Sequence, residues 1–301
     1  ETNKVSEASQ DKNMAFNDYT RNAVGFVAMN ANNGATADKA VRQALMYATD
    51  RQGFCDSYFG WDKKASDEVK KVKGGYVPAA YWNPASENLG AVVRNEETID
   101  GLNTYAFDMD KANQVLDEAG WGRGTDGIRE KDGQKLEIKF LCSEGNSVLD
   151  FLIPMVKKTW GDLGVDLKQT TVDFSTLLSN IQDTSHDSEW NMCFLATSFT
   201  SNQDTSANDS YTNVPANMAV NNYSRINDQA LVDQLTKARA DADAKQSKAD
   251  YVEAMKMAAD DAGYMPVYAG MQFNLYNKKV DLTGTGTLRN WSQSMDTITV
   301  K

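Results

Sequence analysis

The sequence predicts an α/β fold in which a mixed sheet carries helices on its faces. Three observations lead to this prediction. Apolar runs of strand length alternate along the chain with segments whose apolar residues recur at helical spacing. Residues 190–199 (WNMCFLATSF) are almost continuously apolar, which is typical of a strand covered on both faces. Residues 136–140 and 165–172 alternate apolar and polar side chains, as half-buried strands do.

The first third of the chain contains one strand, one helical segment and one long connection. Residues 1–13 are polar and indicate a ragged terminus. Residues 23–30 (AVGFVAMN) predict a strand, and residues 38–59 carry apolar side chains at helical spacing. From residue 60 to residue 105 the periodicity is lost, and prolines, glycines and aromatic residues predict an irregular connection. Connections of that length are usually functional or partly disordered.

The segment 122–127 (GRGTDG) has the GxGxxG spacing of loops that bind dinucleotides. Such a loop needs a strand before the glycines and a helix after them, so that the helix amino terminus faces the phosphates. Here the order is reversed, because residues 108–119 have helical spacing and the pair Asp132-Gly133 marks a hairpin turn further on. We therefore predict helix, turn and hairpin rather than a cofactor loop.

The second half of the chain continues the alternation of helices and strands. Residues 147–164 have helical spacing, although Pro154 is expected to kink this helix or to mark a new start. Residues 173–181 predict a short helix that Asp173 caps. After a long polar loop, the sequence predicts helices over 228–240 and 245–262 and two strands within 265–280.

Composition and charge exclude several classes of function. The formal net charge is -11, and the sequence lacks the basic patch that nucleic acid requires. Cys55, Cys142 and Cys193 are far apart in hydrophobic surroundings, so we expect buried free thiols. The only histidine, His186, lies in a polar segment that predicts a surface position. We therefore predict no metal site, no catalytic triad and no cofactor.

Four segments together resemble one known family. They are VRQALMYATDR (41–51), the block from Tyr105 to Phe140 with its Ala-Gly-Trp helix end, TWGDLGVDLKQTTVDFSTLLSNI (159–181) and NYSRINDQALVDQLTKA (222–238). They resemble the C-terminal half of bacterial extracellular solute-binding proteins of family 5, the peptide and nickel receptors of ABC transporters. The resemblance implies a periplasmic-binding-protein-like C-terminal lobe within a two-lobed clamshell.

This resemblance also implies how the chain is divided and where it works. We expect a polar N-terminal stump over residues 1–22, the second ligand-binding lobe over 23–263, and strands over 264–301 that return to a missing first lobe. The implied function is capture of small peptides outside the cell or in the periplasm for a permease, without catalysis. In the full-length parent a lipid anchor is expected. A related receptor for an oligosaccharide or a metal chelate is the second interpretation.

A third hypothesis, a hydrolase with paired carboxylates in a cleft, belongs to a different class of function. It requires two acidic groups whose pKa values differ because of their surroundings. The sequence singles out no such pair, since Asp260 and Asp261 are adjacent and point in different directions on a helix.

The resemblance implies a site after the strand at residues 190–199. Peptide binders of the family place a tryptophan and an aspartate there, and the aspartate pairs with the ligand ammonium. In this chain those positions hold Thr197 and Thr200, and the nearest carboxylate is that of Asp204. Either Asp204 takes the role through a shifted loop, or the ligand is not anchored by an amine.

An aromatic loop supplies the other candidate contacts. Tyr81 and Trp82 could stack on a ligand, or they could anchor a long loop to the core. The predicted ligand-contacting set is therefore Thr197, Ser198, Phe199, Thr200, Asp204, Tyr81 and Trp82.

Overall fold

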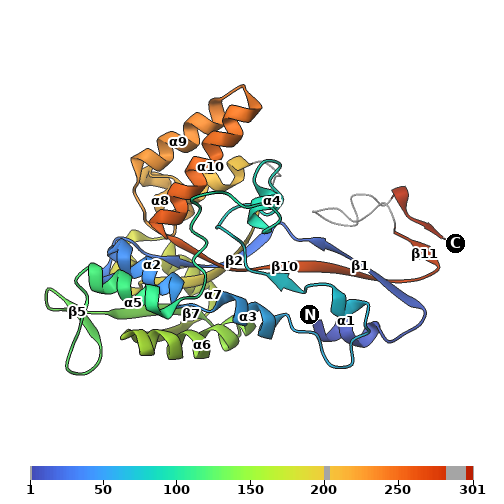
Figure 1. Ribbon diagram of the computed structural model, residues 1–301, viewed down its shortest axis with the longest axis horizontal. Helices are drawn as coiled ribbons and strands as arrows, with labels where there is room; N and C mark the ends of the chain where they lie inside the picture. The colour runs from blue at the N-terminus through green and yellow to red at the C-terminus, as the bar shows by residue number, and fades with distance from the viewer. Residues whose placement is uncertain (1, 200–203, 283–295, 301) are drawn as a thin grey trace.

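The computed structural model describes residues 2–199, 204–282 and 296–300, and a mixed sheet forms its centre (Figure 1). The strands of this sheet are β1 (Met14–Thr20), β2 (Ala23–Met29), β3 (Gly75–Tyr76), β7 (Glu137–Ser143), β8 (Asp166–Val172), β9 (Met192–Ser198) and β10 (Tyr264–Asn277). Their order is β1-β10-β2-β9-β7-β8, and β3 pairs with β10. Strand β7 is parallel to β8 and β9, whereas the other pairs are antiparallel. The predicted mixed sheet is thus confirmed.

Helices cover both faces of the sheet, as predicted. One face carries α2 (Lys39–Tyr47), α3 (Arg51–Tyr58), α5 (Met109–Glu118) and α6 (Ser147–Leu163). The other carries α4 (Gly90–Val93), α7 (Phe174–Ile181), α9 (Gln229–Ala240) and α10 (Ala244–Asp261). Strand β2 packs into both cores, with Val27 and Met29 in the first and Val24, Phe26 and Ala28 in the second. This division follows from the period of two in a strand.

The remaining elements are short. They are α1 (Thr2–Ala8), α8 (Pro215–Asn221), the small sheet of β4 (Gly122–Arg123), β5 (Arg129–Lys131) and β6 (Gln134–Lys135), the pair β11 (Val280–Asp281) and β12 (Thr299–Val300), and the 3-10 turns η1 (Gly34–Ala37), η2 (Val69–Lys71), η3 (Thr184–Glu189) and η4 (Asp204–Tyr211). In Figure 1 the ribbon of β1 and β10 reaches past the rest of the sheet, with α1 and β11 beside it. Within the described ranges, no helix combines the length and apolarity needed to cross a membrane.

Local sequence signals explain several of these elements. Helix α5 precedes the segment 122–127 and the hairpin of β5 and β6 follows it, so the prediction of helix, turn and hairpin is confirmed. Asp132 and Gly133 have φ angles of 51° and 81°, the left-handed pair that a two-residue type I′ turn requires. Asp173 caps α7 by accepting a hydrogen bond of 3.0 Å from the backbone N–H of Thr176.

Three elements differ from the sequence-based expectation. Residues 1–22, expected as a polar stump, contain α1 and β1, and β1 pairs along its length with β10. Pro154 lies inside α6, which continues across it from Ser147 to Leu163, and the residue four positions before it, Asp150, is exposed. The two strands expected within 265–280 are the single strand β10, because successive parts of it pair with β2, β3 and β1.

A close approach between β2 and β10 depends on Gly25. A Cβ atom built on this glycine would lie 2.3 Å from the ring of Tyr268, well inside van der Waals contact. Glycine therefore allows the tyrosine ring to pack closely against β2, which is one of the reasons for glycine in a strand interior. Gly270, in the same sheet, is different, because its Cβ would meet Phe59 at an ordinary 3.6 Å.

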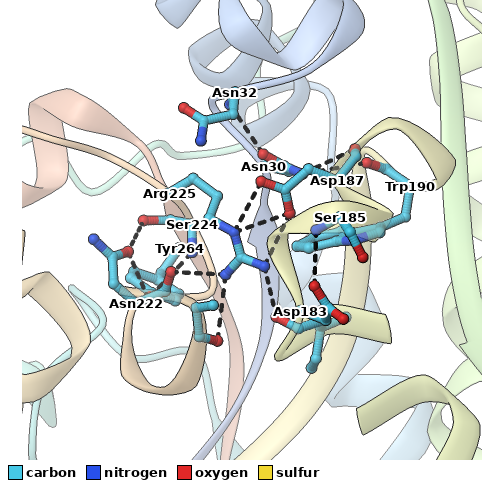
Figure 2. Close-up of polar contacts among 12 residues, drawn as sticks. Asn30, Asn32, Asp183, Ser185, Asp187, Trp190, Asn222, Ser224, Arg225 and Tyr264 are labelled. Atoms are coloured by element: carbon cyan, nitrogen blue, oxygen red, sulfur yellow. Dashed lines mark hydrogen bonds and ion pairs between the residues drawn. The ribbon is translucent and has the colours of Figure 1, made fainter. Parts of the chain in front are cut away.

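A buried ion pair fixes the chain that follows β9 (Figure 2). Arg225 is 1% exposed, and its Nε lies 3.0 Å from Oδ1 of Asp187 in η3. Its other nitrogens donate to the carbonyls of Ile181 at 2.6 Å and Asn222 at 3.1 Å, and the guanidinium lies 5.4 Å from the ring centre of Trp190. Arg225 thus joins the ends of α7 and α8 to η3 and to the start of β9.

We expect Gly25→Ala to lower the free energy of unfolding by about 1–3 kcal/mol, because the Tyr268 ring must move or strain the sheet. Gly270→Ala is the matched control, and we expect a change of no more than about 1 kcal/mol, in the stabilising direction. Urea unfolding followed by tryptophan fluorescence measures both values. Equal effects of the two substitutions would contradict the close packing of Tyr268 on β2.

We expect Arg225→Gln to cost about 3 kcal/mol or more, because it leaves the carboxylate of Asp187 partly buried without its counter-ion. The control is Lys39→Gln, which removes an exposed ion pair of 2.6 Å with Asp260. That substitution is expected to cost less than about 1 kcal/mol. Urea midpoints at a shared m-value compare the two, and similar costs would show that Arg225 is solvated in solution.

Candidate functional site

A hollow of about 470 Å³ opens at the carboxyl end of β9. It is bounded by β2, β9, the middle of β10 and the end of α3, with Val5 of α1 at its side. Thr197 and Ser198, two of the predicted contacts, line it. Ligands of α/β proteins commonly bind in crevices at the carboxyl ends of strands. This hollow is therefore the candidate site.

The strand register decides which side chains face the interior of this hollow. Thr197 lies opposite Val24, and Val24 packs into the core beneath α9 and α10. Ser198 is the next residue, so it points to the other face of the sheet, where the ring of Tyr268 covers Gly25. Ser198 is exposed. We infer that Ser198 presents its hydroxyl to the hollow, whereas Thr197 contributes mainly backbone.

Three aromatic rings form one side of the hollow, and we call Tyr58, Phe59 and Tyr268 the aromatic wall. Their centroids are 5.0 Å apart for Tyr58 and Phe59, 5.2 Å for Phe59 and Tyr268, and 6.1 Å for Tyr58 and Tyr268. Phe151 of α6 extends the wall, since its centroid is 5.4 Å from Tyr58 and the residue is 50% exposed. Burial raises the pKa of Tyr268 to about 12, so its hydroxyl is neutral at physiological pH.

A cation stands beside the aromatic wall. Arg21 lies in the short link between β1 and β2, is exposed and lines the hollow. In the described part of the chain its guanidinium makes no hydrogen bond or ion pair. Its charge acts against the larger effect of burial on the pKa of Tyr268, so the guanidinium lies within electrostatic range of that hydroxyl. The hollow therefore contains an uncommitted positive charge.

Two other hollows also contain arginine side chains. One of about 590 Å³ contains Arg51 and Arg94, but Arg51 donates to backbone carbonyls and Arg94 pairs with Glu96 at 2.6 Å. Another, of about 840 Å³, follows the ribbon of β1 and β10. It shares Arg21, Gln272 and Phe273 with the candidate site. The site thus continues along β10 rather than ending at Arg21.

The other predicted contacts that the structure describes do not line the candidate hollow. Phe199 is 6% exposed, and its ring centroid lies 6.1 Å from that of Tyr81. Tyr81 and Trp82 are 6% and 0% exposed and belong to the core beneath α9 and α10. This burial agrees with the anchoring interpretation of the aromatic loop. Thr200 lies outside the described residues.

The carboxylate of Asp204 is engaged within the protein. Asp204 is 2% exposed, and its Oδ1 accepts a 2.9 Å hydrogen bond from Nε1 of Trp82 and a second from the hydroxyl of Ser86. Its Oδ2 is buried and has no hydrogen-bond partner among the described residues. Asp204 therefore links η4 to the aromatic loop that carries Tyr81 and Trp82.

The described cysteine and histidine side chains, residue types that often take part in catalysis, lie outside the hollow. Cys55, Cys142 and Cys193 are buried and free, as predicted, and burial raises the pKa of each thiol to about 12. His186 is partly exposed in η3, with Nδ1 3.0 Å from a carboxylate oxygen of Glu189. Among the residues that the structure describes, no group of three histidine, cysteine or acidic side chains could hold a metal ion.

Sequence reasoning missed Arg21, Tyr58, Phe59 and Tyr268 as parts of this site. Arg21 lies in the segment that was expected to be a stump, so its charge was not weighed. The aromatic residues belong to α3 and β10, which are more than 200 residues apart along the chain. The available signal was the pair of adjacent aromatic residues Tyr58 and Phe59 at the end of a helical stripe, which periodicity alone reads as a helix end.

The fold is that of known receptors. The chain superimposes on the oligopeptide-binding protein AppA of Bacillus subtilis in complex with a nonapeptide, with a TM-score of 0.72, 19% identity and coverage of 96% of this chain and 53% of that one. For NikA of Brucella suis in complex with Fe(III)-EDTA the TM-score is 0.74 at 20% identity, covering 99% and 55%. The chain thus spans about half the length of these structures.

Sequence comparison gives the same family. The oligopeptide-binding protein AppA of Bacillus subtilis is 28% identical over 157 residues, which are 52% of this chain and 25% of that protein. The nickel-binding periplasmic protein of Escherichia coli is 24% identical over 244 residues, 80% of this chain and 41% of that protein. The family model for bacterial extracellular solute-binding proteins, family 5 (middle part), matches residues 1–219. This chain therefore belongs to the family 5 bacterial extracellular solute-binding proteins.

Proposed function

We propose that this chain forms the second lobe of a receptor that captures oligopeptides for an ABC-type importer and performs no catalysis. The observation that carries the proposal is the hollow at the carboxyl end of β9, lined by Thr197 and Ser198. Relatives named as oligopeptide-binding proteins favour a peptide ligand. The continuation of the hollow along β10 suits an extended ligand, which is recognised largely through its backbone.

The remainder of the receptor belongs to the same proposal. Residues 23–263 form the second lobe, and the ribbon that includes β10 leads to a first lobe that closes over the ligand. Coverage of 53% and 55% of the two solved structures supports a second lobe of similar size. The receptor works outside the cytoplasmic membrane, held by a lipid anchor, and delivers its ligand to a permease. Residues 264–301 supply the connecting strands.

A second candidate ligand is an oligosaccharide or a metal chelate. The aromatic wall favours it, because planar rings stack on sugar faces and on chelate rings. One solved relative of comparable TM-score holds Fe(III)-EDTA. The ligand contents of the protein distinguish the two candidates.

We expect the protein expressed from its complete gene in rich medium, and purified without refolding, to carry a ladder of short peptides. Native mass spectrometry measures the added masses directly. The control is the same protein unfolded, dialysed and refolded, which should be empty and should take up peptides from a defined mixture. Bound sugar or chelate supports the second candidate. A protein that is empty and takes up no peptide contradicts the peptide proposal.

Asp204→Ala tests whether this carboxylate serves the fold or the ligand. We expect a loss of about 1–3 kcal/mol in the free energy of unfolding, because the donors of Trp82 and Ser86 lose their acceptor. Asp209→Ala, an exposed position in the same turn, is the control and should leave stability within about 0.5 kcal/mol.

Peptide retention by the two variants completes this test. We expect both to retain peptides as the unchanged protein does, at a temperature where all are folded. Loss of retention in Asp204→Ala at unchanged stability would instead support the sequence-based hypothesis that Asp204 pairs with the ligand ammonium.

A further inference from the structure

The candidate hollow offers positive charge and no negative charge. Among the described residues that line it there is no aspartate or glutamate, and Arg21 is its one charged side chain. The only carboxylate that the family resemblance brings near this region, that of Asp204, is 2% exposed and bonded to Trp82 and Ser86. An ammonium group would therefore find no counter-ion in the hollow, whereas an anion would find one.

We propose that this hollow binds the carboxylate of a ligand whose adjoining group is aromatic or apolar. Arg21 neutralises the carboxylate, Ser198 and Gln272 donate hydrogen bonds to it, and the aromatic wall packs on the adjoining group. This inference rests on the proposed function and specifies which chemical end of the ligand this lobe recognises. For a peptide, it is a carboxylate end with an apolar or aromatic side chain.

The availability of Arg21 is the first support. Three other arginines that the structure describes are occupied within the fold: Arg225 pairs with Asp187 at 3.0 Å, Arg129 with Asp117 at 2.6 Å, and Arg94 with Glu96. Arg21 has no such partner in the described ranges, yet it borders a hollow. A guanidinium presents a planar set of donors that matches a carboxylate, so an incoming carboxylate gains charge-assisted hydrogen bonds.

The neutral donors are the second support. Ser198 and Gln272 are both exposed and line the hollow. Register places Ser198 on the face of Tyr268, and β10 brings Gln272 four positions beyond Tyr268 on the same strand. Residues an even number of positions apart share a face of a strand. Arg21, Ser198 and Gln272 thus present donors around one space.

The aromatic wall is the third support. Its rings lie within 5.0–6.1 Å of one another, so they form a continuous surface rather than isolated contacts. Phe151 of α6 packs against Tyr58 with a centroid distance of 5.4 Å and supports the wall from that side. Burial of apolar ligand surface against the wall contributes to affinity whatever the charge of the ligand. The wall therefore accounts for affinity, and Arg21 accounts for the preference for an anionic group.

The net charge of the chain does not oppose this assignment. A net charge of -11 repels anions at long range, but salt screens charges beyond about 8 Å at physiological ionic strength. A carboxylate in contact with Arg21 lies within that distance, and most acidic residues lie outside the hollow. The local cation therefore decides the sign of the interaction.

Two small probes separate the charge from the ring. N-acetyl-L-phenylalanine carries the ring and a carboxylate without an ammonium, whereas L-phenylalaninamide carries the ring and an ammonium without a carboxylate. Each is titrated into the 301-residue chain and followed by the amide NMR shifts of residues 196–198 and 268–273. We expect the acetylated acid to bind at least about fivefold more tightly than the amide.

Variants then assign the difference to Arg21. We expect Arg21→Gln to weaken binding of N-acetyl-L-phenylalanine at least about fivefold and to leave the amide unchanged. Arg239→Gln, the same chemical change at an exposed position on α9, is the control and should have no effect. Thermal unfolding of both variants checks that each is folded at the temperature of the titration.

The outcomes distinguish this inference from the proposed function. Equal or tighter binding of the amide, or an unchanged affinity in Arg21→Gln, overturns the carboxylate assignment and leaves the receptor proposal standing. If neither probe moves these amides, the assignment is also overturned. The receptor proposal then depends on the native mass spectra: bound peptides uphold it, and a protein that takes up no peptide contradicts it as well.

Discussion

Strand β10 is the constraint on which the rest of the structure depends. Along its 14 residues it pairs with β2 at residues 264–268, with β3 at 269–270 and with β1 at 271–277. These partner strands come from the N-terminal part of the chain. Strand β10 therefore makes the strand pairs with the longest sequence separations in the described fold. A register shift between Pro266 and Tyr268 accommodates the proline, which has no N–H to donate. The same shift lies beside the tyrosine that covers Gly25 and forms part of the aromatic wall.

The candidate site and the segment that follows β9 are held in place separately. Its wall and its serine belong to strands and to α3, which are held by the two cores on either side of the sheet. The chain after β9 is fixed by a different device, the buried pair of Arg225 and Asp187. Loss of the β10 pairing and loss of the Arg225–Asp187 pair would therefore affect different parts of the molecule. The hollow depends on β10, whereas the position of Asp204 depends on how the segment up to Arg225 is held.

Much of the fold could be predicted because it depends on local patterns. The strand at 23–30, the cap at Asp173 and the turn at Asp132-Gly133 follow from periodicity and turn chemistry. The site could be predicted only in part, because it depends on which segments meet. Ser198 was expected from the strand that carries it, but Arg21 and the aromatic wall require the pairing of β10 with β1 and β2. No local pattern specifies that pairing across more than 200 residues.

The placement of charges bears on the ammonium anchor that the family resemblance implies. A carboxylate can hold a ligand ammonium only where it reaches the ligand, and the carboxylate of Asp204 instead accepts hydrogen bonds from Trp82 and Ser86. A cation in the same lobe can hold a carboxylate only if no acidic residue already neutralises it, and Arg21 meets that condition within the described residues. Because Asp204 is buried and Arg21 is exposed, the lobe presents a positive rather than a negative charge to the ligand. The lobe can therefore keep the family fold while it selects the opposite end of its ligand.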